Sequence, residues 1–492
     1  EKILFYKPGW QVMAKKISSK AKLEKRTLQL VDKINKRSYD GAKTGRRTGN
    51  WVSAGNSANA EIAPALSLLR NRSRELVRNN PYAAKAMRVL CTNYIGTGIT
   101  ANIKDKKVAA LYKKWIKECD ADGHFDLYGL QRLIARAEPE SGECLIRIRY
   151  RKPSDGLSVP MQLQVLEADY LDSYKFEDLP NGGWIQHGIE YDGLGKRAAY
   201  WMYKQHPGDM SPKLQGLESF RVPAEDVIHF YDKTRPGQAR GVPVLAPSML
   251  TANDLDDYLE ATLVRKGAEA CIAAFVKTDD ENRNIGIETA DSNNERIEGL
   301  SPVMVQYLNP GEEISFSNPS TSTGDVGYTN DRLHAIAVGA GVTYEQMTGD
   351  LSQVNYSSIR AGTLDFRREV EQWQWINFIP IVCEKIFKKF LDVAVISGKI
   401  KSADVDVEWT TPRFDWVDPV KDVQGEGMEI GLGLKTWAES VRGRGYDPDK
   451  VLEDLIAEKE RFAKAGITHP MDNVKVKGIG GQNEPPPDTP KN

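Results

Sequence analysis

Long apolar runs are absent from this sequence of 492 residues. Its longest uninterrupted apolar stretches, such as residues 271–276, are far shorter than the roughly 20 residues that a bilayer-spanning helix needs. The first 20 residues contain no apolar segment of the kind that marks a secretory signal peptide. We therefore expect neither a membrane-spanning helix nor a signal peptide.

Cysteine is scarce, and its spacing suits neither disulfides nor a metal site. The chain has five cysteines, none in a CxxC pair, and an odd number spread over this length is a poor disulfide framework. Buried free thiols in a reducing compartment are the expected outcome. The five are Cys91, Cys119, Cys144, Cys271 and Cys383.

Catalytic motifs are also missing. The stretches "GAKTGRRTG" (41–49) and "GLGLKT" (431–436) both fail the spacing of a phosphate-binding P-loop. The "GTG" at 96–98 does not follow a predicted strand, which removes a dinucleotide-binding interpretation. The six histidines are scattered without an HExxH motif, and no GxSxG occurs. We expect no enzyme activity, no catalytic residue, no metal site and no cofactor.

The charge is unevenly distributed although the chain as a whole carries only −1. Residues 1–49 hold 14 Lys or Arg against 4 Asp or Glu, a balance of +10 that leaves −11 for the remainder. A basic arm on an acidic body is typical of a segment that touches nucleic acid or an acidic partner. A solvated arm without a ligand explains the same composition equally well.

Hydrophobic periodicity predicts helices, then strands, then helices again. Asn80 is a candidate N-cap after a helix break at Asn79–Asn80, and Gly96 is a candidate C-cap. Residues 143–235 carry short β-type runs separated by Gly, Pro and Asp. The helical segments expected elsewhere are 61–79, 81–95, 108–119, 127–138, 247–276, 330–339, a long helix through 363–391, and two or more between 418 and 465, with a strand in "DVDVEWTTP" (404–412).

The long helix follows a polar loop, about 346–357, and has an aromatic-rich apolar stripe. Ser357 or Ser358 is expected to cap it, and Pro380 to kink it. Trp373 lies on the stripe and is expected in the core, whereas Trp375 fits core and surface equally well. The stripe positions are Ile359, Phe366, Val370, Trp373, Ile376, Ile379, Phe387 and Phe390.

Four stretches in fixed order resemble the portal proteins of tailed bacteriophages, in particular the lambda-like portal family. They are "RNNPYAAKAMRVLCTNYIGTGI" (78–99), "VPAEDVIHFYDKTRPGQARGVPVL" (222–245), "YLNPGEEISFSNP" (307–319) and "LHAIAVGAGVTYEQMTGDLSQVNYSSIRAG" (333–362). The resemblance continues through "TWAESVRGRGYDPDKV" (436–451) and covers roughly residues 62–465. Each piece alone is weakly specific, but their joint order is distinctive.

The resemblance implies an α+β portal-protein fold: a helix-rich wing with a β-rich part, a two-helix stem, an α/β clip and a helical crown. The corresponding segments are 1–60 (basic N-terminal arm and linker), 61–246 (wing), 247–276 (first stem helix), 277–328 (clip), 329–345 (second stem helix), 346–357 (tunnel loop), 358–411 (long kinked wing helix and strand), 412–475 (crown) and 476–492 (disordered tail).

The resemblance also implies a homo-dodecameric ring at one capsid vertex, through which double-stranded DNA is packaged and ejected. The implied partners are the major capsid protein, the terminase large subunit and a head–tail adaptor. A scaffold protein is an optional further partner. The location implied is the virion, after assembly in the host cytoplasm. The alternative is a DNA-binding or other connector protein that forms no ring and uses the basic arm.

Candidate functional residues follow from the same resemblance. Ser352, Gln353, Val354, Asn355 and Tyr356 would form the tunnel loop around DNA. Asp254, Asp256, Asp257 and Glu260 would line the channel and repel DNA, or else form salt bridges with Arg265, Lys266 or a neighbouring subunit. Asn309, Pro310, Glu312 and Glu313 would contact terminase or adaptor. Trp373, Trp375 and Phe366, on one of two apolar helices (82–94 and 363–391), would contact neighbouring subunits.

Overall fold

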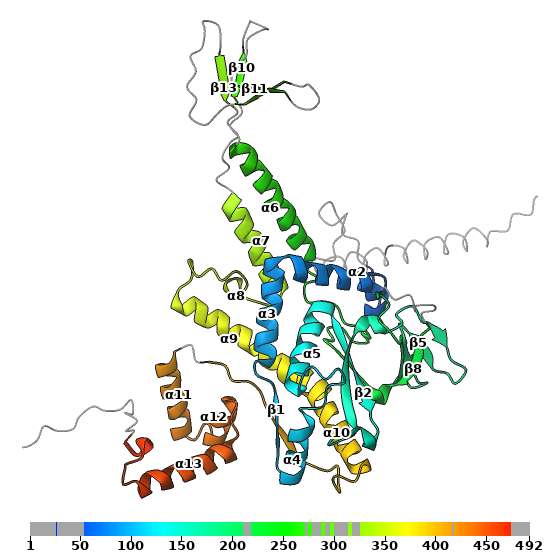
Figure 1. Ribbon diagram of the computed structural model, residues 1–492, viewed down its shortest axis with the longest axis vertical. Coiled ribbons are helices and arrows are strands. Elements are labelled where there is room, and N and C mark those ends of the chain that lie inside the picture. The colour runs from blue at the N-terminus through cyan, green and yellow to red at the C-terminus, as the bar shows by residue number, and fades with distance from the viewer. Residues whose placement is uncertain are drawn as a thin grey trace, which may run out of the picture. The chain divides into compact units, whose positions relative to one another are not determined.

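The computed structural model describes residues 54–209, 218–270, 325–415 and 418–473, together with four short strands between 274 and 316 and the isolated Arg26. The chain divides into two compact units, Glu1–Ser57 and Ala58–Asn492. The second unit holds the elements below (Figure 1). The basic arm and the tail from residue 474 lie outside the described residues.

A helical layer opens the second unit. α2 (Ala58–Asn79) and α3 (Pro81–Ile95) are separated at Asn80, whose side chain accepts hydrogen bonds from the backbone N–H of Tyr82 and Ala83. Pro81 occupies the first turn, where its missing N–H costs nothing, and Gly96 ends the helix. The predicted break and both predicted caps are therefore confirmed.

The β-rich part contains two antiparallel sheets. One has the order β3–β2–β9, from Met161–Glu167, Glu143–Tyr150 and Val227–Tyr231. The other has the order β4–β5–β6–β7–β8, in sequence order. Its strands are Glu177–Asp178, Trp184–Gln186, Ile189–Tyr191, Arg197–Met202 and Phe220–Pro223. A small buried cluster that includes Leu145 and Tyr200 packs between them.

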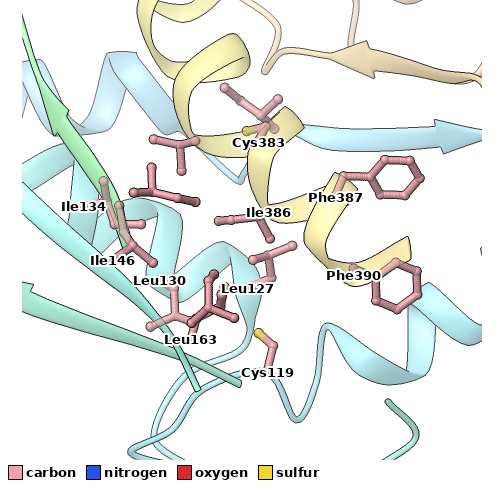
Figure 2. Close-up of a cluster of buried hydrophobic side chains, with 14 of the residues drawn as sticks. Cys119, Leu127, Leu130, Ile134, Ile146, Leu163, Cys383, Ile386, Phe387 and Phe390 are labelled. Atoms are coloured by element: carbon pink, nitrogen blue, oxygen red, sulfur yellow. The ribbon is translucent and has the colours of Figure 1, made fainter. Parts of the chain in front are cut away.

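The main core lies on the three-stranded sheet (Figure 2). It collects α4 (Lys106–Trp115), α5 (Leu127–Ser141) and α10 (Glu384–Ile396). Phe390 is fully buried and meets Tyr112 and Trp115 ring to ring. The described thiols, including Cys119 and Cys383 in this core, are free and buried, as predicted.

A second core joins α2 and α3 to the helix pair α6 (Met249–Ala270) and α7 (Asp325–Gly339). Figure 1 shows α6 and α7 side by side, in contact along their length. Leu255 of α6 and Ile336 of α7 are buried there. α8 (Tyr344–Thr348) and α9 (Tyr356–Gln372) complete this core through Met347, Phe366 and Val370.

The first helix of this pair is shorter than predicted. It ends at Ala270, and β10 (Ala274–Lys277) follows, so the predicted helix over 247–276 is wrong at its C-terminal end. The apolar run that ends at Val276 is rich in residues that suit either element, and periodicity alone does not separate a buried strand from a helix there.

Short strands follow α6. β10 pairs with β13 (Glu313–Phe316), and β11 (Ile287–Ala290) pairs with β12 (Arg296–Gly299).

The long helix changes its pitch in the middle. Between α9 and α10, residues Trp373–Cys383 form a π-helix that contains Pro380. Proline lacks a backbone N–H and crowds the preceding turn, and the wider π-helical turns occur at this place. The kink predicted at Pro380 stays a prediction. The apolar stripe shifts with the π-helix: Ile376 is 62% exposed, and Phe378 is fully buried in its place.

The remaining elements lie at the C-terminal end. β14 (Val407–Thr410), the predicted strand, pairs with β1 (Thr100–Ile103). Three helices follow, α11 (Pro419–Gly431), α12 (Trp437–Gly443) and α13 (Pro448–Lys464). Among the described residues, every helix is too short or too polar to cross a membrane.

Candidate channel loop and surrounding surfaces

The polar loop between α8 and α9 is bounded by well-formed caps. Thr343 and Gln346 form a capping box at the start of α8, and Gly349 ends α8 with a φ of 77°. Asn355 then caps α9 by accepting a hydrogen bond from the Ser358 N–H at 2.9 Å. The predicted caps Ser357 and Ser358 are wrong, because the helix begins one turn earlier than expected.

The loop itself is solvent-exposed. Ser352, Gln353 and Asn355 are exposed, and Val354 is half-buried. Asp350 accepts a hydrogen bond from the Ser352 N–H at 2.9 Å, which forms a tight turn at the loop's start. Tyr356, predicted to lie in the loop, is instead the first residue of α9. The loop is therefore a six-residue polar segment, 350–355, held at both ends.

The start of α9 contacts the start of α11 through side chains. The Tyr356 hydroxyl donates to the Asp418 carboxylate at 3.3 Å and accepts from Arg360 at 3.2 Å. Arg360 forms an ion pair with Asp422 at 2.9 Å. Lys421 lies over the Tyr356 ring, 5.9 Å from its centroid. This contact fixes the helix turn behind the loop against the C-terminal helices.

The four acidic residues on α6 do not share one environment. All four are exposed, but Asp256 accepts two hydrogen bonds from the Asn80 amide, at 2.8 and 3.0 Å, at the α2–α3 break. Asp257 accepts from Asn253 one turn earlier. At about 100° per residue, Asp254, Asp257 and Glu260 fall within one arc of about 120° on the side away from Leu255. Asp256 thus stabilises the helix junction, and the other three form an exposed acidic face.

The aromatic residues predicted at a subunit interface separate into two groups. Phe366 and Trp373 are buried within the chain, in the second and main cores, so neither is exposed in the way that an interface residue is expected to be. Trp373 also lines the cavity described below, and the subunit contact of both residues stays a prediction. Trp375 is 51% exposed, next to the exposed Ile376. The two belong to the π-helix, where the pitch turns them outward.

The other predicted contact residues fall largely outside the described part. Asn309, Pro310 and Glu312 are not among the described residues. Glu313 begins β13 and stands opposite Lys277 of β10 in the antiparallel register.

A buried ionic node is the feature that the sequence did not reveal. Glu143, fully buried at the start of β2, is paired with Arg70 of α2 at 2.7 Å and with Arg240 at 2.6 Å. His229 of β9 lies 2.9 Å from its second oxygen. Because these partners outweigh the effect of burial, the pKa of Glu143 lies well below its usual value.

The node explains why "QARG" (238–241) occurs where it does. The Gly241 N–H donates to Glu143 at 3.1 Å, and a Cβ on Gly241 would overlap the backbone carbonyl of Gly142. A glycine is thus required beside the arginine. The available signal was an Arg-Gly pair after a buried strand, which does not identify its distant acidic partner.

Among the described residues, one cluster has the spacing of metal ligands: Glu167, Asp169 and His206. Its carboxylates are already engaged. Asp169 pairs with Arg70 at 3.1 Å and with Arg74 at 2.7 Å, and Glu167 pairs with Arg74 and His206. Two arginines beside the cluster favour an ion-pair network over a cation site.

Comparisons with known proteins agree on one family. The family model described as phage portal protein, lambda family, matches residues 44–374. This match begins earlier than the resemblance seen in the sequence, which begins near residue 62. The chain is 27% identical to a probable portal protein of Halomonas phage phiHAP-1, over 88% of each chain. It is 21% identical to portal protein B of Escherichia phage lambda, over 87% of this chain and 90% of that one.

Among the solved structures similar to this chain is the neck of a native gene transfer agent particle computed with C12 symmetry. The two chains are 13% identical with a TM-score of 0.43, and the match covers 82% of this chain and 99% of that one. Another is an HK97-family phage portal protein from Corynebacterium diphtheriae, at 11% identity and a TM-score of 0.33, covering 72% and 97%.

The α+β architecture, with its paired helices and its capped polar loop, is that of a structural protein of the tailed-phage portal class rather than an enzyme. Since the family model covers well over half of the sequence, the chain belongs to the lambda family of phage portal proteins.

Proposed function

We propose that twelve copies of this chain form a ring at one capsid vertex, with an axial channel through which double-stranded DNA is packaged and ejected. The observation that carries the proposal furthest is the 350–355 loop: short, polar, capped at both ends and rooted on a helix that is buried in two cores. A segment that meets moving DNA needs a solvated surface and a rigid base, and this segment has both.

The acidic face of α6 supports the same function. Asp254, Asp257 and Glu260 repeated around a ring would give closely spaced bands of negative charge. Lysines at these places would hold phosphates by counterion release, whereas carboxylates repel DNA over about 8–10 Å at physiological salt. The α6–α7 pair is accordingly the proposed stem, and the strands between them belong to the proposed clip.

The proposed partners follow from this assignment. Terminase and then the head–tail adaptor would dock on the clip, and the major capsid protein and a scaffold protein would meet the wing. Trp375 and Ile376 supply an exposed apolar patch for the neighbouring subunit. The ring would be assembled in the host cytoplasm and carried in the virion.

Single-particle imaging of the purified full chain tests the ring directly. The expected result is about a dozen subunits around a hole at least about 20 Å wide, enough for duplex DNA. Monomers or dimers without a hole, over a range of salt and protein concentrations, would refute the ring and favour DNA binding through the basic arm.

The acidic face is tested by charge reversal. Asp254→Lys combined with Asp257→Lys is expected to slow DNA packaging in vitro at least several-fold while rings still form, because phosphates would then be attracted to the channel wall. Asp404→Lys, an exposed site after α10, is the matched control and leaves the rate unchanged. Equal packaging rates for all three proteins would remove the repulsion argument without touching ring formation.

A further inference from the structure

A cavity of about 380 Å³ lies where α2, α3, α5, the π-helix and the turn after β9 meet. Its apolar walls come from Val244, Pro247 and the neighbouring residues, and polar and charged side chains supply the rest of the lining. Neither the proposed channel nor the subunit patch uses it. Its most informative lining residues are Glu61, Tyr94, Glu138, Asp232, Arg235 and Trp373.

The inner end of the cavity carries an aromatic wall. The rings of Tyr94 and Trp373 stack with their centroids 4.0 Å apart and their planes 8° from parallel. The Trp373 indole N–H lies near enough to the Glu138 carboxyl to lower its pKa. Among the described residues, however, this N–H has no hydrogen-bond partner of normal geometry.

Glu138, on α5, lines this cavity, and only 3% of its surface is exposed to solvent. Burial, and to a smaller extent the nearby Asp232 carboxylate, raise its pKa to about 8. The Trp373 and Asp232 N–H groups act in the opposite direction but do not compensate. Asp232 stands exposed at the opening and accepts a hydrogen bond from Asn377 at 3.1 Å.

The cation at the opening is already engaged. Arg235 forms an ion pair with Glu61 at 2.5 Å, so these two charges cancel at the edge of the cavity. Two carboxyl groups at different depths, Glu138 and Asp232, are then left facing an aromatic wall. Such a surface attracts a positive charge through its carboxylates.

We propose that this cavity binds a primary ammonium or guanidinium group, held between Glu138, Asp232 and the Tyr94–Trp373 stack. The group has two possible sources of the same chemistry: a small free cation, or a Lys or Arg side chain of a second copy of this chain. The inference does not depend on ring formation.

Cation binding is coupled to the proton on Glu138. The charged groups that line the cavity with Glu138 are Asp232 and Arg235 after β9 and Glu61 of α2. Tyr94 of α3, which is neutral, lines it as well. With a pKa of about 8, Glu138 is mostly protonated at pH 7 in the empty cavity. A bound cation favours the carboxylate, so binding at pH 7 releases close to one proton.

Calorimetric titration of the full chain with n-butylammonium chloride, at pH 7 in two buffers of different ionisation enthalpy, measures both binding and proton release. 1-Butanol is the neutral probe of the same shape. Saturable binding of the ammonium alone, with close to one proton released, supports the site. Glu138→Gln is expected to weaken binding at least tenfold and abolish the proton release.

The matched control is Glu140→Gln, on the same helix, where the carboxylate pairs with Arg136. It is expected to bind like the unmodified chain. Asp232→Asn, at the exposed opening, is a second variant that leaves the core intact and is expected to weaken binding several-fold.

Comparing monomers with assembled particles distinguishes the sources. Binding to both indicates a free cation, and binding to monomers alone indicates that a neighbour's side chain fills the cavity in the assembly. Absence of ammonium binding in both forms, or binding of 1-butanol equally well, would overturn the proposal. None of these outcomes bears on whether a ring forms.

Discussion

Lowering the pH from 7 to 5 is expected to destabilise the β-rich part of the chain through His229 of β9. This side chain is buried, and its Nε2–H donates to Glu143 while Nδ1 accepts from Arg197 at 3.3 Å. Protonation would turn Nδ1–H toward a guanidinium, so the ring is held neutral. Burial is the main cause that lowers the pKa of His229 to about 4.

The magnitude follows from the two pKa values. An unfolded histidine titrates near 6.5, so between pH 6.5 and pH 4 the unfolded chain binds a proton that the folded chain does not. Stability is therefore complete above pH 6.5 and falls as the pH drops toward 4. Between pH 7 and pH 5 the loss from this one group is about 2 kcal/mol.

The assay is urea unfolding of the full chain and of His229→Gln at several pH values. The glutamine amide still donates to Glu143 but does not titrate, and the carboxylates common to both proteins cancel in the comparison. The pH dependence of the unfolding free energy should be about 2 kcal/mol smaller in the variant over this range. Parallel curves for the two proteins would show that His229 is not kept neutral by the fold.

Two further substitutions probe other parts of the chain. Gly241→Ala places a Cβ against the Gly142 carbonyl and is expected to cost at least about 4 kcal/mol, measured by thermal unfolding. Gly425→Ala, inside α11 with open space around it, is the control and is expected to stabilise the chain by up to about 1 kcal/mol, because alanine favours a helix interior over glycine. Asn355→Ala removes the α9 cap and is expected to destabilise the first turn of that helix by about 1 kcal/mol, seen as faster amide exchange over 356–359; unchanged exchange would contradict the capping role.

The sequence predicted what depends on local chemistry. Asn80 and Pro81 specify a helix start by themselves, and the structure confirms both. The buried thiols and the strand near residue 407 were also predictable from composition and period. The order of the family stretches then identified the class, which the family model confirms.

What the sequence did not predict depends on distant partners or on pitch. Glu143 is an ordinary acidic residue at a strand start until Arg70 and Arg240 are brought to it by the fold. Ile376 and Phe378 exchange their expected places because a period of 3.6 was assumed through a π-helical stretch. The residues proposed for the channel and the clip stay predictions.

The π-helix between α9 and α10 also determines how far α10 is rotated about the helix axis relative to α9. Its wider turns place Trp373 and Phe378, five positions apart, in the same core, where ring centroids lie 5.0 Å apart. One residue fewer would turn α10 by about 100° relative to α9 and carry Phe387 and Phe390 away from the sheet. The stretch therefore works as a fixed angular offset, and its length in residues is as constrained as its side chains.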